Sequence, residues 1–149
     1  MDFQKDDRID HLADYRDDMN KLLRYLPWME EHRSAQVVST YDGSDTQKQS
    51  FSFPVYDSTL LSFVREAEKT KLMTKNYPYG YTRNGIRTTE QEIQFIRSAR
   101  AKNIEDLKCI LSKHVLMGRT KGGVWPQAVA DGIFAEILTK FTELLRLGV

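Results

Sequence analysis

The sequence has little cysteine and no long apolar run, and each shortage excludes a class of protein. Its 149 residues include one cysteine, Cys109, which excludes an internal disulfide and is typical of a reducing compartment. No apolar segment approaches the roughly 18 residues that a membrane-spanning helix needs, so we expect no membrane partner. Residues 1–7 are acidic and contain no apolar stretch, so we also expect no signal peptide and a cytoplasmic location.

Motifs for metal binding and nucleophilic catalysis are also missing. None of the histidines, His11, His32 and His114, has a second ligand at a spacing such as H-E-x-x-H. Cys109 lies among apolar residues of a predicted helix, which is typical of a buried cysteine. The segment Gly118–Gly123 contains Gly, Thr and Lys, but not in the Walker order, and a predicted helix precedes it instead of a strand. We therefore predict no catalytic residue, no metal ligand and no cofactor, and we favour a protein that is not an enzyme.

What the sequence does contain fits one globular domain. Hydrophobic residues make up 40% of the chain, aromatic residues 11% and charged residues 29%. The apolar fraction is large enough to form a buried core, and the charged fraction is typical of a folded protein with a water-exposed surface. A single domain commonly comprises about 100–200 residues. We therefore predict that residues 1–149 form one helical domain.

Apolar residues recur at three- and four-residue steps in several segments, which is the spacing of amphipathic helices. The clearest helix is expected from Ile9 to Leu26, ending at Pro27. Further helices are expected from Asp57 or Ser58 to about Thr70, after the capping box Thr89-Glu90-Gln91-Glu92, from Asn103 to a left-handed terminator at Gly118, from Trp125-Pro126 to Asp131-Gly132, and from Ile133 to Leu145. The pattern predicts a mainly α, compact, bundle-like fold of about five or six helices, with a loop or short β-hairpin around residues 35–55.

The net charge of +1 conceals an uneven distribution. Residues 71–121 hold eleven bases and four acids, a net charge of +7, whereas residues 1–31 hold nine acids and five bases, a net charge of −4. Such asymmetry can mark an anionic partner. It is equally consistent with an acidic first helix that packs against a basic middle segment.

One part of the basic segment combines tyrosines with arginines. The Pro and Gly content of Asn76–Gly85 predicts a turn or an extended loop. Alternating tyrosines on an extended segment point to one face, where they can stack on bases or anchor a partner, and neighbouring arginines can meet phosphates. The candidate binding residues here are Tyr77, Tyr79, Tyr81, Arg83 and Arg87. The alternative is structural: the tyrosines pack the loop down while the arginines extend to water.

A second candidate group lies in the Gly-rich turn before Trp125. Arg119, Thr120 and Lys121 stand there, and such a turn can coordinate a simple anion with its backbone N–H groups. The alternative is a helix terminator followed by a turn that carries Trp125 into the core.

These segments also carry a family resemblance. The patterns are Asn76-Tyr77-x-Tyr79-x-Tyr81-x-Arg83, Thr120-Lys121-Gly122-x-x-Trp125 and Ala128-Val129-x-x-Gly132-Ile133-Phe134-x-x-Ile137-Leu138-x-Lys140. Over roughly residues 50–147 the chain resembles an uncharacterised family of small bacterial proteins, a domain of unknown function. The resemblance implies a bacterial cytoplasmic origin and a shared fold, and it implies no activity, cofactor or catalytic residue. The family pattern has Tyr at the position of His114, so the resemblance assigns no shared role to this histidine.

The sequence leaves the function unknown and three hypotheses open. The leading one is a non-enzymatic binding or regulatory module that docks a protein or an anionic ligand on its basic middle segment. One alternative is an enzyme that acts on a phosphorylated or carboxylated small molecule, which requires a pocket containing a titratable group such as His114. The other is a nucleic-acid-binding protein, although no RRM, KH, zinc-finger or clear helix-turn-helix signature supports it.

Overall fold

The computed structural model describes residues 3–33 and 57–147, with side chains described for residues 12–33 and 57–146. The described residues form eight α-helices and one short 3-10 helix, so the predicted number of five or six helices is wrong. The elements are α1 (Phe3–Leu23), α2 (Leu26–His32), α4 (Ser58–Glu68), α5 (Tyr77–Asn84), α6 (Thr89–Ser98), η1 (Ala101–Asn103), α7 (Ile104–Met117), α8 (Val124–Asp131) and α9 (Ile133–Leu147). The predicted loop or hairpin around residues 35–55 lies outside the described residues. Within the described ranges, no helix is long and apolar enough to cross a membrane.

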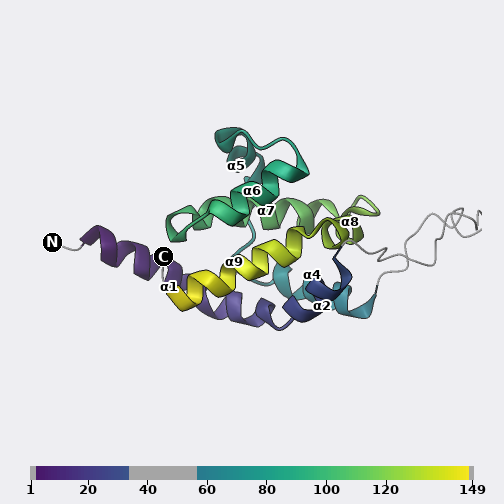
Figure 1. The fold of residues 1–149 in the computed structure, drawn as a ribbon, viewed down its shortest axis with the longest axis horizontal. Coiled ribbons are helices and arrows are strands. Elements are labelled where there is room, and N and C mark those ends of the chain that lie inside the picture. Colours follow the sequence, from purple (N-terminus) through teal and green to yellow (C-terminus); the bar gives the residue numbers. More distant parts are fainter. Residues whose placement is uncertain (1–2, 34–56, 148–149) are drawn as a thin grey trace, which may run out of the picture.

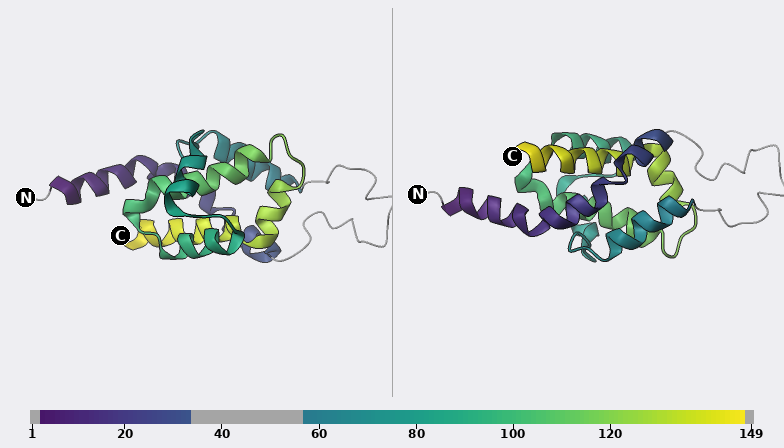
Figure 2. Two further views of the ribbon diagram at one scale, coloured as in Figure 1. Left: turned by 90° about the horizontal axis from the view of Figure 1, so that it is seen from above. Right: turned by 90° about the horizontal axis from the view of Figure 1, so that it is seen from below.

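Helix α9 occupies the middle of the arrangement (Figure 1). It contacts α1 and α2 on one side, α6 on another, and α7 and α8 as well. Helix α5 packs mainly against α7. Helix α8 crosses between the C-terminal end of α7 and the start of α9, as the two views of Figure 2 show. The start of α6, the end of α7 and α8 lie near one another, since residues of all three line one cavity.

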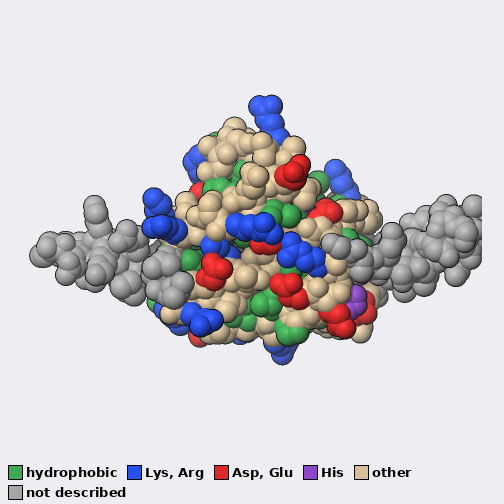
Figure 3. Space-filling view, viewed as in Figure 1, with side chains coloured by type: hydrophobic (Ala, Val, Ile, Leu, Met, Phe, Trp, Pro, Cys, Tyr) green, Lys and Arg blue, Asp and Glu red, His purple; other side chains and the backbone are tan. Residues whose placement is uncertain are grey.

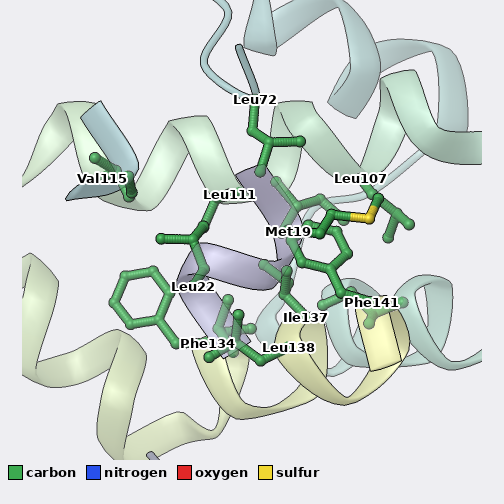
Figure 4. Packing of buried hydrophobic residues seen from close by; sticks show 14 of the residues in the cluster. Met19, Leu22, Leu72, Leu107, Leu111, Val115, Phe134, Ile137, Leu138 and Phe141 are labelled. Atoms are coloured by element: carbon green, nitrogen blue, oxygen red, sulfur yellow. The ribbon is translucent and has the colours of Figure 1, made fainter. Parts of the chain in front are cut away.

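The hydrophobic core forms around α9 (Figure 4). Its fully buried side chains include Phe134, Ile137, Leu138 and Phe141. The side chains that meet them from other elements include Met19, Leu22, Leu72, Leu107, Leu111 and Val115. Burial of each large apolar side chain contributes about 1.5–3 kcal/mol relative to exposure. Because every regular element of the described residues is helical, the prediction of a mainly α fold is confirmed for them.

Pro27 begins a helix and does not end one. The structure ends α1 at Leu23, three residues before the predicted boundary, and Pro27 lies in the first turn of α2. The first backbone N–H groups of a helix have no partner within the helix, so a proline costs nothing there. The sequence therefore contains a second short helix where we predicted only a terminator.

The segment Tyr77–Asn84 is a helix, which corrects the prediction of a turn or extended loop. Pro78 again lies in the first turn, and Gly85, with φ of 65°, forms a left-handed C-cap. Gly80 lies inside the helix because α5 packs tightly against α7: a Cβ atom at Gly80 would stand 2.6 Å from Sγ of Cys109. In a helix Tyr77 and Tyr81 share a face and Tyr79 points elsewhere, so the three tyrosines do not form one row.

The capping box of α6 lies one residue earlier than predicted. Thr88 is the N-cap: its side chain accepts a hydrogen bond from N–H of Gln91, whose own side chain accepts from N–H of Thr88. The predicted box placed Glu92 three residues after the cap. In the observed box Gln91 takes that position, and the side chain of Glu92 is buried.

Candidate functional site

A cleft of about 410 Å³ opens where α6, α7 and α8 meet. Small-molecule sites typically occupy about 300–1,000 Å³, so the cleft has room for a small organic ligand. Its lining carries charged, imidazole and amide side chains, namely Arg87, Glu92, Lys113, His114, Gln127 and Asp131.

Close packing between α7 and α8 shapes one end of this cleft. Gly118 has φ of −67°, so it is not the left-handed terminator that we predicted. It is a glycine because the indole of Trp125 lies against it: a Cβ atom would stand 2.1 Å from Nε1. That Nε1 donates a hydrogen bond of 2.9 Å to the backbone oxygen of Val115. Gly123, with φ of 89°, then starts α8 and contributes to the cleft wall.

The floor of the cleft is built on the carboxylate of Glu92. Its Oε2 atom accepts a hydrogen bond from the hydroxyl of Tyr81 and one of 2.8 Å from Nε2 of His114. Nζ of Lys113 lies 3.9 Å from the same oxygen and 4.5 Å from the centroid of the Tyr81 ring. We call these four residues the Glu92 network. It joins α5, α6 and α7 and fixes the two α7 side chains at the cleft.

The Glu92 network changes the acidity of its members. Burial by itself would raise the pKa of Glu92, but the hydrogen bonds from His114 and Tyr81 and the charge of Lys113 outweigh it, so the pKa is lowered. Burial and the adjacent carboxylate raise the pKa of Tyr81, which keeps its hydroxyl protonated as a donor. Because an ionised carboxylate only accepts, Nε2 of His114 carries the proton. No described residue is placed to hydrogen-bond Nδ1 of His114.

Two further charges reach the cleft from different parts of the chain. Arg87 lies in the loop before α6, is exposed, and has no ion-pair partner within the described ranges. Asp131 is the last residue of α8, and its Oδ1 accepts a hydrogen bond of 2.8 Å from Nε2 of Gln127. The carboxylate of Asp131 likewise has no cationic partner among the described residues.

The other predicted arginine of this segment lies elsewhere. Arg83 is paired with Asp106 and lines a second cavity of about 380 Å³ together with Tyr79 and Cys109. Tyr79 is 70% exposed. Burial raises the pKa of the Cys109 thiol, so the thiol stays protonated and is a poor nucleophile.

The turn after α7 forms a third location. Nε of Arg119 lies 3.3 Å from a carboxylate oxygen of Glu68 on α4. The hydroxyl of Thr120 donates to the backbone oxygen of Met117, 3.4 Å away, and the side chain of Lys121 is exposed. None of Arg119, Thr120 and Lys121 lines the cleft.

The structure thus separates the eight predicted site residues. Arg87 lines the cleft and Tyr81 supports it through the Glu92 network. Tyr77 is half-buried on α5 and is not among the residues that line either cavity. In the described part of the chain, no group of three or more His, Cys, Asp or Glu side chains is placed to hold a metal ion.

A comparison with protein families decides what the chain is related to. The model of a family described as "Family of unknown function (DUF6508)" matches residues 15–146. The chain belongs to the DUF6508 family. This confirms the predicted resemblance to an uncharacterised domain of unknown function, and the matched region of the DUF6508 family contains every residue that lines the cleft. No curated protein matches the chain, and no solved structure matches it.

Four charged or amide residues of the cleft in this DUF6508 protein were not predicted as site residues from its sequence: Glu92, Lys113, Gln127 and Asp131. Glu92 was assigned to the wrong position of the capping box. A signal was present, because the alternative box Thr88-x-x-Gln91 was equally visible. Gln127 and Asp131, four residues apart on one helix, had no distinguishing pattern, since such pairs are common on exposed helix surfaces.

Proposed function

We propose that the protein binds a small molecule with an anionic group in the cleft between α6, α7 and α8. The observation that carries this proposal is the guanidinium of Arg87, which lines the cleft without an ion-pair partner in the described residues. Arginine presents a rigid fork of N–H donors that matches carboxylate and phosphate oxygens. Lys113 and His114, neighbours on α7, also line the cleft, where the charge of Lys113 is offset by Glu92 and His114 adds an imidazole.

The distribution of the other bases favours this site over an extended docking surface. Lys and Arg side chains are interspersed with Asp and Glu on the face shown in Figure 3, and they do not form one continuous patch there. Five of the eleven bases between residues 71 and 121 form ion pairs with other described residues, namely Arg83, Arg97, Lys108, Lys113 and Arg119. Much of the basic middle segment therefore neutralises the protein's own carboxylates. This supports a local anion site more than docking of a nucleic acid or a protein.

Titration with ethyl phosphate and with propionate tests the proposal. Binding to the full chain would be followed by NMR or calorimetry, first for the wild type and then for Arg87→Ala. We expect the substitution to weaken binding about tenfold or more, which is the value of one charge-assisted hydrogen bond. The matched control is Arg100→Ala, because Arg100 is also exposed and lies outside the cleft. Equal affinity of wild type and Arg87→Ala would overturn the proposal, and so would failure of ethyl phosphate, propionate and their amine-bearing analogues all to bind.

A second candidate function is an enzyme that uses His114 as an acid–base group. The specific observation is the arrangement of the imidazole: Glu92 holds Nε2–H at 2.8 Å, and Nδ1 is left without a partner among the described residues on the cleft wall. A carboxylate that orients an imidazole in this way is a common device of general-base catalysis. The test is hydrolysis of p-nitrophenyl phosphate and p-nitrophenyl acetate. Activity that is present in the wild type and in Arg100→Ala but lost in His114→Ala would favour this function. Rates equal to the buffer rate would favour binding alone.

A further inference from the structure

Two opposite charges line the cleft without neutralising each other. Arg87 and Asp131 both reach it, yet they form no ion pair, and neither has another ionic partner in the parts of the chain that the structure describes. The remaining charges at the cleft behave differently. Lys113 and Glu92 belong to the Glu92 network, so their charges offset each other.

The carboxylate of Asp131 can accept a further hydrogen bond. Gln127 lies one helical turn earlier on α8, and its Nε2 donates to Oδ1 of Asp131 at 2.8 Å. This hydrogen bond orients the carboxylate and leaves Oδ2 without a partner among the described residues. A ligand with only a negative charge would gain from Arg87 but would be repelled by Asp131. A ligand that also carries a positive charge would be attracted at both ends.

We infer that the ligand is zwitterionic: a small molecule with a carboxylate or phosphate at one end and a protonated amine at the other. The anionic group meets Arg87 and the ammonium group donates to Asp131. This inference rests on the proposed function of the cleft, and it adds the chemical class of the ligand. The volume of about 410 Å³ suits a molecule larger than a bare ion.

Matched probes with and without an amine test the inference on the full chain. The phosphate pair is O-phosphoethanolamine and ethyl phosphate, and the carboxylate pair is β-alanine and propionate. We expect the amine-bearing member of at least one pair to bind about tenfold more tightly, the gain of one charge-assisted hydrogen bond. The pair that shows the gain also identifies the anionic group.

The variant Asp131→Asn should remove the preference for the amine-bearing probes. Its affinity for the amine-free probes should be equal or higher, because the negative charge that repels them is gone. Asp14→Asn is the control, since Asp14 is exposed on α1, outside the cleft. Equal binding of the two members of both pairs by the wild type would overturn the inference and leave the proposed function intact. A preference that survives in Asp131→Asn would also overturn it. Failure of all four probes to bind would overturn the inference and the proposed function together.

Discussion

Replacement of Glu92 by glutamine should destabilise the protein by about 1–3 kcal/mol at neutral pH. A hydrogen bond to a charged group contributes about 1.5–3 kcal/mol and a neutral one about 0.5–1.5 kcal/mol, so the loss of charge weakens the bonds from Tyr81 and His114 by roughly 1 kcal/mol each. The half-exposed Lys113, 3.9 Å away, adds less than about 1 kcal/mol. An amide is easier to bury than a carboxylate, which offsets part of this loss.

The effect should depend on pH in a defined direction. The pKa of Glu92 is lower in the folded protein than its ordinary value of about 4.3. Its ionised form therefore stabilises the fold fully above that value, and this contribution is lost as the pH falls through the folded pKa. The difference in unfolding free energy between wild type and Glu92→Gln should accordingly shrink below about pH 4.

Urea denaturation at pH 7 and at lower pH, followed by the fluorescence of Trp28 and Trp125, measures both effects. The matched control is Glu90→Gln, because Glu90 lies two residues earlier on α6 and is exposed. It should change stability by no more than about 0.5 kcal/mol. The reasoning would be refuted if Glu92→Gln were as harmless as the control at pH 7, or if its cost did not shrink below about pH 4.

Two glycine substitutions test the close helix contacts by the same urea measurement. Gly118→Ala places a Cβ atom 2.1 Å from Nε1 of Trp125. It should lower the free energy of unfolding by about 2–4 kcal/mol, through overpacking and the loss of the indole hydrogen bond. Unchanged stability would contradict the packing of α7 against α8. Gly80→Ala places one 2.6 Å from Sγ of Cys109 and should cost about 1–3 kcal/mol, although alanine normally stabilises a helix interior. The double variant with Cys109→Ala should recover part of that loss, and a loss that stays the same would show that the thiol is not the cause.

The sequence predicts those helices whose apolar periodicity is strong. The last helix is an example: it was predicted from Ile133 to Leu145, and the structure has it as Ile133–Leu147, with one face at the centre of the core. Helix α5 was not predicted, since Pro78 and Gly80 are ordinarily signs of a loop. Only the contact of Gly80 with Cys109 explains why a glycine belongs inside that helix, and this contact joins residues 29 positions apart in the chain.

The cleft was harder to predict than the fold for a related reason. Thr88 and Thr89 can both cap a helix, and neither choice shows that Glu92 is buried, because its burial depends on the face of α6 that packs against the rest of the protein. The presence of Asp131 and Arg87 at one cleft depends on how α8 crosses between α7 and α9, which local sequence does not determine. Arg87 was predicted as a binding residue because it follows the tyrosine segment. In the structure it lines the cleft, whereas Arg83 lines the second cavity.

A crystal structure of the protein grown with O-phosphoethanolamine tests the central claim most directly. The account predicts ligand density in the cleft between α6, α7 and α8, with phosphate oxygens within hydrogen-bond distance of the guanidinium of Arg87 and the amine within the same distance of the carboxylate of Asp131. Ligand bound at another surface, with the cleft free of it at a saturating concentration, would contradict the account.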